Sequence, residues 1–388
     1  MANSRLPAGV QDVLPRECSI LTELKLKLER KFSLAGFSPV LSAGLEYYET
    51  FSGKENAVPE ERMFKMTDTD GKLLVLRPDT TLSIARIAAT KLNSDRARLS
   101  YFADKYDLEN GGGLSSREIY QAGVECLGEE GAFSDAQCIA FAIECLKEAG
   151  LRDFIIDIGH VGYFKGLLEE SGLSPFQAED VRACINRKDT MNAERLLKKA
   201  GVSGDALNNI LALPALFGGR EVFSVAEALT HNSCARKAVD DLKDIDRLLT
   251  EMGYEGYISY DLGMIKPLSY YSGILFSGLV KDLGAPVLSG GRYDNLADAF
   301  GKHMPAVGFA MGLKRILVAL ERQGSLPEEK KPLVIVAEEG QEARAYREFV
   351  SRTERGERVR LSALTGKEGA KQEQDAGYEV LPVGGNAC

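Results

Sequence analysis

The chain has 388 residues, of which 44% are hydrophobic and 27% are charged, and its formal net charge at pH 7 is −9. This length is enough for a large core and for two or three domains. The acidic balance argues against a mainly nucleic-acid-binding surface, because phosphate contacts need clustered Lys and Arg. The N-terminus has no secretory signal and no segment is apolar enough to span a membrane, so we expect a cytoplasmic protein without a membrane partner.

Cysteine and histidine are used sparingly. The seven cysteines include no CxxC pair, and there are only three histidines. An odd number of cysteines without such a pair indicates reduced thiols. Since the sequence has no His/Cys cluster and no Walker-type phosphate loop, it predicts neither a metal site nor a bound cofactor.

Periodicity and turn residues predict the elements of the chain. In chain order we expect a helix over 19–35, a hairpin over 62–78 around Asp70-Gly71, a helix over 80–92, a strand pair from Leu99 to Glu125 around a Gly-rich loop, a helix over 134–149, a strand over 155–160, helices only over about 166–249, strands over 257–264, 270–280 and 286–296, and a helix over 313–321. The tail after a charged, Pro-bounded linker is expected to form a β-α-β-β unit.

Strands that do not strictly alternate with helices indicate the α+β class, with an antiparallel sheet flanked by helices. We expect a core domain over 1–322 with a helical insertion at about 166–249, a linker over 323–331, and a small α/β C-terminal domain over 332–388.

Four segments of the core domain carry short motifs. Each motif alone is a weak signal, but their order and spacing together make a specific pattern. They are RPDTT at 77–81, YQAGVE at 120–125, SGGRYDNL at 289–296 and PAVGFAMGLKRI at 305–316. This set resembles the motifs of histidyl-tRNA synthetase, a class II aminoacyl-tRNA synthetase, over about 1–322. The resemblance implies the class II fold and a homodimer of the core domain.

The resemblance also implies a pocket for free histidine. Its residues would be Asp79, Thr81, Gln121, Glu125, Lys266, Tyr271 and Tyr293. In that family the residues at 79 and 81 hold the α-ammonium group, those at 121 and 125 contact the ammonium and the imidazole, and the tyrosines face the imidazole. Independently of the family, Glu125 lies between apolar neighbours on a strand, where an inward carboxylate is costly unless it has a partner. For Arg292 and Asp294, simple closure of a turn is an equally open interpretation.

The departures from the synthetase pattern concern the adenylation chemistry. Asp107 stands where the synthetases have the arginine that contacts the α-phosphate, and an anion there would repel the phosphate. Lys266 replaces a second arginine and lacks its planar fork. Arg315 is retained, but Ala43 replaces the proline of the first class II motif, and the tail after Arg322 is shorter than the synthetases' anticodon-binding domain.

This profile resembles the paralogous family of ATP phosphoribosyltransferase regulatory subunits, which have no catalytic residues of their own. The resemblance implies a cytoplasmic hetero-oligomer with the short-form catalytic subunit, which this chain would support in the first step of histidine biosynthesis and in feedback regulation by histidine. It implies no tRNA partner. Two alternatives stay open: a histidyl-tRNA synthetase, and a stand-alone histidine-binding sensor.

Overall fold

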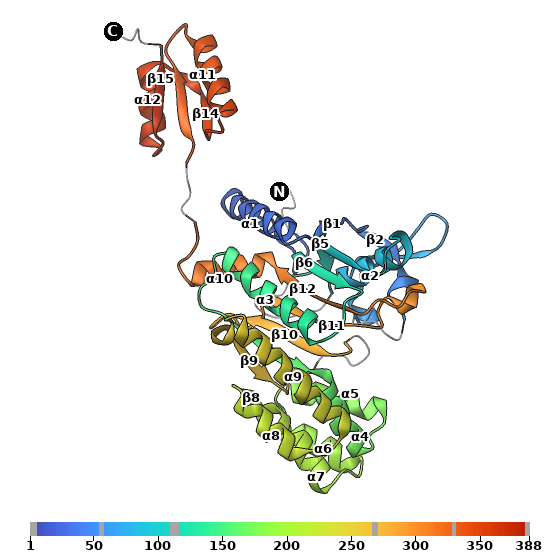
Figure 1. The fold of residues 1–388 in the computed structure, drawn as a ribbon. Coiled ribbons are helices and arrows are strands. Elements are labelled where there is room, and N and C mark those ends of the chain that lie inside the picture. The colour runs from blue at the N-terminus through green and yellow to red at the C-terminus, as the bar shows by residue number, and fades with distance from the viewer. Residues whose placement is uncertain (1–5, 54–57, 109–115, 266–270, 328–330, 385–388) are drawn as a thin grey trace. The chain divides into compact units, whose positions relative to one another are not determined.

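The computed structural model describes residues 6–53, 58–108, 116–265, 271–327 and 331–384. The chain divides into two compact units, Met1–Leu326 and Pro327–Cys388 (Figure 1). No described helix is long and apolar enough to cross a membrane.

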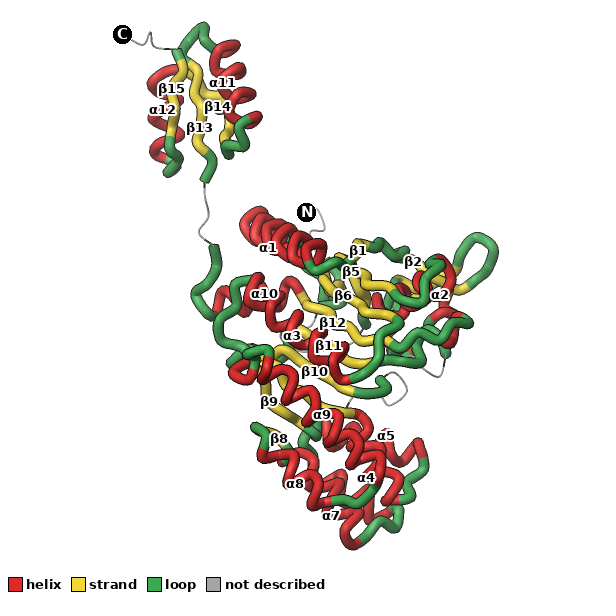
Figure 2. Tube along the Cα trace, viewed as in Figure 1, coloured by secondary structure: helices red, strands yellow, loops and turns green. Residues whose placement is uncertain are grey.

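Among its described residues, the first unit contains ten α-helices and twelve strands. Figure 2 shows how these elements are arranged. The helices are α1 Pro15–Leu34, α2 Thr80–Lys91, α3 Ala132–Glu148, α4 Val161–Ser171, α5 Pro175–Asn186, α6 Thr190–Lys199, α7 Gly204–Ala212, α8 Glu221–Leu229, α9 Ser233–Glu251 and α10 Leu313–Arg322. The strands are β1 Ser38–Pro39, β2 Leu45–Tyr47, β3 Lys65–Thr67, β4 Leu73–Leu76, β5 Ala97–Tyr106, β6 Glu118–Leu127, β7 Ile155–His160, β8 Phe217–Gly218, β9 Ile258–Asp261, β10 Ile274–Leu279, β11 Leu288–Arg292 and β12 Ala306–Gly312.

Nine of these strands form one sheet, in the order β1-β5-β6-β12-β11-β10-β7-β9-β8. The predicted α+β class is confirmed, but the sheet is mixed, because β1 pairs with β5 and β7 with β9 in parallel. The remaining strands form a small antiparallel sheet in the order β2-β4-β3, which contains the predicted Asp70-Gly71 hairpin. The expectation of helices only in the insertion is wrong in one detail, since β8 adds to the edge of the large sheet beside β9. The helical segment also begins earlier than predicted, with α4.

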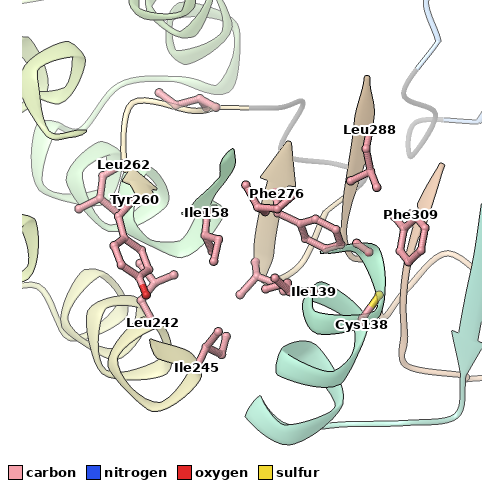
Figure 3. Close-up of a cluster of buried hydrophobic side chains, with 14 of the residues drawn as sticks. Cys138, Ile139, Ile158, Leu242, Ile245, Tyr260, Leu262, Phe276, Leu288 and Phe309 are labelled. Carbon is pink, nitrogen blue, oxygen red and sulfur yellow. The ribbon is translucent and has the colours of Figure 1, made fainter. Parts of the chain in front are cut away.

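Side chains of β6 alternate between two environments, as the period of a strand requires. Ala122, Val124 and Cys126 point into the main core, where α1, α3 and α10 pack against the sheet. The opposite face meets α2 and a smaller core. The main core continues beneath α9, where Leu242 and Ile245 lie near Ile158 of β7 (Figure 3). The insertion is therefore anchored to the sheet by the same apolar cluster that holds the sheet together.

The second unit is a β-α-β-α-β fold with a parallel sheet in the order β14-β13-β15. Its elements are β13 Leu333–Ala337, α11 Glu342–Glu354, β14 Val359–Thr365, α12 Gly366–Asp375 and β15 Val380–Val383. The predicted β-α-β-β unit lacked α12. This helix has no apolar stripe, because its buried residues are Gly369 and Glu373, so hydrophobic periodicity could not indicate it.

Candidate functional site

One face of the large sheet forms the floor of a cavity of about 500 Å³. Alternate residues of β5 and β6 reach this face, so that Gln121 and Glu125 line the cavity beside Tyr101 and Lys105. On the neighbouring strand β12, Gly308 pairs with Glu125 in the sheet register. A Cβ atom at position 308 would overlap Glu125 Oε2, so glycine is required there for the carboxylate to lie flat on the strand.

Glu125 is the most buried acid of the cavity, with 1% of its surface exposed. The Thr81 hydroxyl, at the start of α2, donates to Glu125 Oε1 at 2.8 Å, and the Tyr293 hydroxyl donates to Oε2. Burial raises the pKa of Glu125 to about 8, against the opposing effect of these hydrogen bonds. The carboxyl group therefore holds a proton near neutral pH unless a positive group comes close to it.

The other predicted histidine contacts lie along the same cavity. Asp79 caps α2, its carboxylate accepting from the Leu82 backbone N–H at 2.8 Å. Gln121, Tyr271 and Tyr293 line the cavity as well. The structure thus brings together six of the seven predicted residues. Lys266 lies outside the described residues, as does the Gly-rich loop at 111–113.

Asp107 lies at another part of the cavity wall, where it meets Arg62 in a two-pronged ion pair. Arg62 Nε donates to Asp107 Oδ1 at 2.9 Å, and Nη2 donates to Oδ2. The backbone carbonyl of Arg62 also accepts from the Leu108 N–H at 2.9 Å. The charge of the Asp107 carboxylate is therefore balanced by Arg62. The Arg62 guanidinium group is engaged by this carboxylate at the end of β5.

Two further guanidinium groups line the cavity. Arg315, at the start of α10, donates to the Pro286 carbonyl at 3.0 Å, and burial lowers its pKa. Arg182, from α5 of the insertion, pairs with Glu179 and donates to the Ile265 carbonyl at 3.3 Å. The insertion therefore contributes a cation to the wall of the cavity in the sheet.

Arg292 and Asp294 do more than close a turn. Arg292 Nε donates to Asp135 of α3 at 2.8 Å, and Nη1 donates to Asp294 at 2.9 Å and to the Glu129 carbonyl at 3.0 Å. This buried network fixes the end of β11. Tyr293, between them in sequence, points to the other side and reaches Glu125.

Sequence reasoning missed Arg62, Tyr101 and Gly308. Tyr101 had a detectable signal, because it shares the alternation of β5 with Asp107 and must face the same side. Its hydroxyl is buried and has no hydrogen-bond partner among the described residues. Arg62 gave no signal, since its position opposite Asp107 depends on how the β3–β4 hairpin folds back onto the sheet.

Comparison with known proteins agrees with this geometry. The family model for histidyl-tRNA synthetase matches residues 9–316. A regulatory subunit of ATP phosphoribosyltransferase from Acetivibrio thermocellus is 43% identical, over 82% of this chain and 76% of the relative. Another, from Ruminiclostridium cellulolyticum, is 37% identical over the same shares of both chains.

Solved structures are similar over nearly the whole chain. A crystal structure described as an ATP phosphoribosyltransferase regulatory subunit/histidyl-tRNA synthetase from Bacillus halodurans C is 28% identical, with a TM-score of 0.85 over 99% of each chain. Histidyl-tRNA synthetase from Nostoc sp. PCC 7120 shares the fold, with a TM-score of 0.79 at 21% identity over 97% of this chain and 90% of that one. The chain therefore belongs to the histidyl-tRNA synthetase family and, within it, to the ATP phosphoribosyltransferase regulatory subunits.

Proposed function

We propose that this protein is the non-catalytic regulatory subunit of ATP phosphoribosyltransferase, the enzyme of the first step of histidine biosynthesis. The observation that carries the proposal is the 43% identity, over 82% of the chain, to a relative named as such a subunit. The cavity supports it, because Asp107 and its partner Arg62 occupy the position where adenylation needs an unengaged cation. The partner is a short-form catalytic subunit, and both act in the cytoplasm.

The complex is tested by mixing this chain with the purified short catalytic subunit. We expect the two to comigrate on a sizing column, and we expect this chain to raise the rate of phosphoribosyl-ATP formation. Separate elution together with an unchanged rate would contradict the proposal and would favour the stand-alone sensor.

We further propose that the cavity around Glu125 binds free histidine and that this binding carries feedback regulation. The ligand offers an ammonium group and an imidazole, and Asp79, Gln121 and Glu125 offer acceptors for them. A charged ligand nitrogen beside Glu125 would stabilise its carboxylate form, which burial alone disfavours. Such regulation requires only a coupling free energy between the two sites, typically about 1–3 kcal/mol.

Histidine binding is tested by thermal melting of this chain. A ligand present at 100 times its Kd and bound only to the folded state stabilises it by about 2.7 kcal/mol. Glu125→Ala should remove most of this shift, whereas Glu118→Ala, on the same strand but outside the cavity lining, should leave it intact. A melting curve that millimolar histidine leaves unmoved, with and without the catalytic subunit, would contradict the proposal.

The same chain should not aminoacylate tRNA, and its core should form a homodimer. Histidine-dependent exchange of pyrophosphate into ATP tests the first claim, because it measures the adenylation step that must precede the transfer of histidine to tRNA. Exchange at the rate usual for synthetases would contradict the regulatory role, because loss of one transition-state donor alone costs on the order of 10²–10³ in rate.

A further inference from the structure

A second cavity, of about 680 Å³, lies between the insertion and the end of β11. Arg292 and Asp294 line it, whereas Tyr293, between them, lines the first cavity. The two cavities therefore lie on opposite sides of one short segment. Tyr271 lines both.

His160 presents one unsatisfied donor to this second cavity. Its Nδ1 accepts the Gly162 backbone N–H at 3.0 Å at the start of α4, so the proton of the neutral ring must be on Nε2. Burial lowers the pKa of His160 to about 4, which keeps the ring neutral. Nine-tenths of the side chain is buried, with 10% exposed, and the nearest carboxylate oxygen, of Asp241, is 3.7 Å from Nε2.

The distance between His160 and Asp241 is too long for a hydrogen bond, so the Nε2–H can donate to an acceptor that approaches from the cavity. A ligand hydroxyl oxygen can be that acceptor. Both groups line the second cavity, so a ligand hydroxyl can reach them.

Two lysines stand around the same pair of residues. Lys165 of α4 lines the cavity and has no hydrogen bond or ion pair within the described ranges of the chain. Lys237 of α9 donates to Asp241 at 2.7 and 2.9 Å, which uses at most two of its three N–H donors. Both lysines line the same cavity, as does Cys234.

The acids of the second cavity restrict where a negative ligand group can lie. Asp135 and Asp294 are engaged by Arg292, and Asp241 by Lys237. Glu130, before α3, keeps an anion away from that side of the cavity. The remaining place for an anion is between α4 and α9, next to the two lysines and beside the His160 donor.

We propose that the second cavity binds a small hydroxylated anion, such as a sugar phosphate or sugar acid, whose anionic group lies beside Lys165 and Lys237 and whose hydroxyl group accepts from the Nε2–H of His160. The proposal concerns a site separate from the histidine cavity and does not depend on histidine binding.

Isothermal titration of the full chain tests this site with four probes: ribose 5-phosphate, ribonate, inorganic phosphate and ribose. We expect ribose 5-phosphate or ribonate to bind, and the tighter of the two identifies the anionic group. Inorganic phosphate and ribose should each bind at least about tenfold more weakly than that probe, because each offers only half of the recognised chemistry.

Variants separate the two halves of the site. Lys165→Gln should weaken the binding of the anionic probe by about tenfold or more. His160→Asn retains an acceptor that can cap α4 and should weaken that probe while leaving inorganic phosphate unchanged. Lys243→Gln is the matched control, since Lys243 is also on α9 but pairs with Glu227. Melting curves without ligand verify that each variant folds.

Three results would overturn the proposal. They are the absence of binding by ribose 5-phosphate and ribonate at millimolar concentration, binding that is unchanged in both Lys165→Gln and His160→Asn, and equal affinity for inorganic phosphate alone.

Discussion

The first cavity contains two buried carboxylates whose surroundings differ. Asp107, 5% exposed, is met by the guanidinium group of Arg62, so its charge is balanced within the chain. Glu125 receives its hydrogen bonds from two neutral hydroxyl groups, those of Thr81 and Tyr293. A buried carboxylate held by neutral donors gains from a positive ligand, whereas one already paired with arginine does not. Within one cavity, one carboxylate is therefore neutralised by the chain's own arginine, whereas the other can still be stabilised by a positive group of a ligand.

The packing around Glu125 is tested most strongly by the variant Gly308→Ala. The added methyl group would overlap Glu125 Oε2 and lie 2.5 Å from the Val124 carbonyl oxygen. We expect unfolding by urea to show a loss of about 1–3 kcal/mol, with the histidine-induced melting shift strongly reduced. Gly44→Ala is the control, because its Cβ would meet no atom within 4 Å. Equal behaviour of the two variants would contradict the close packing around Glu125.

The Asp107 end is tested by a double-mutant cycle with Arg62→Gln and Asp107→Asn. The side chains are 31% and 8% exposed, so the pair is intermediate between surface and buried ion pairs. We expect a coupling free energy of about 1–2 kcal/mol, with histidine binding unchanged in all variants. The exposed Lys27–Glu23 pair of α1 should couple by about 0.3–0.5 kcal/mol. Additive effects at Arg62 and Asp107 would show that their contact contributes no stability.

The protonation of Glu125 is tested by the pH dependence of stability. Its pKa rises from an ordinary 4.5 to about 8 on folding, so the folded state binds more protons than the unfolded state between these values. The stability contributed by Glu125 is therefore fully present below about pH 4.5 and is lost as the pH rises through 8.

The measurement compares the wild-type chain with Glu125→Gln, which keeps the shape and cannot ionise. The free energy of unfolding of the wild-type chain, minus that of Glu125→Gln, should fall as the pH rises. The slope should approach about 1.4 kcal/mol per pH unit. Glu23→Gln, on the exposed face of α1, is the control. A difference that stays flat from pH 5 to about 8 would contradict the protonated state of Glu125.

The motifs of the sequence were enough to predict the fold class and six of the residues that line the first cavity. The resemblance to the synthetase motifs implied that Gln121, Glu125 and Tyr293 share one pocket, and all three line the cavity. What could not be predicted depends on contacts between distant segments. Arg62 and Asp107 meet only because the β3–β4 hairpin folds onto the sheet, and Arg292 meets Asp135 only because α3 packs behind β11. The helix α12 was missed for a different reason, since a polar helix leaves no apolar periodicity.

Tyr271 gives the molecule a wall shared by its two cavities. If both ligands bind as proposed, a movement of Tyr271 caused by one ligand changes the space that is open to the other. Linkage then requires each ligand to change the affinity of the other by the same factor, so that one residue would couple the protein's response to two different small molecules.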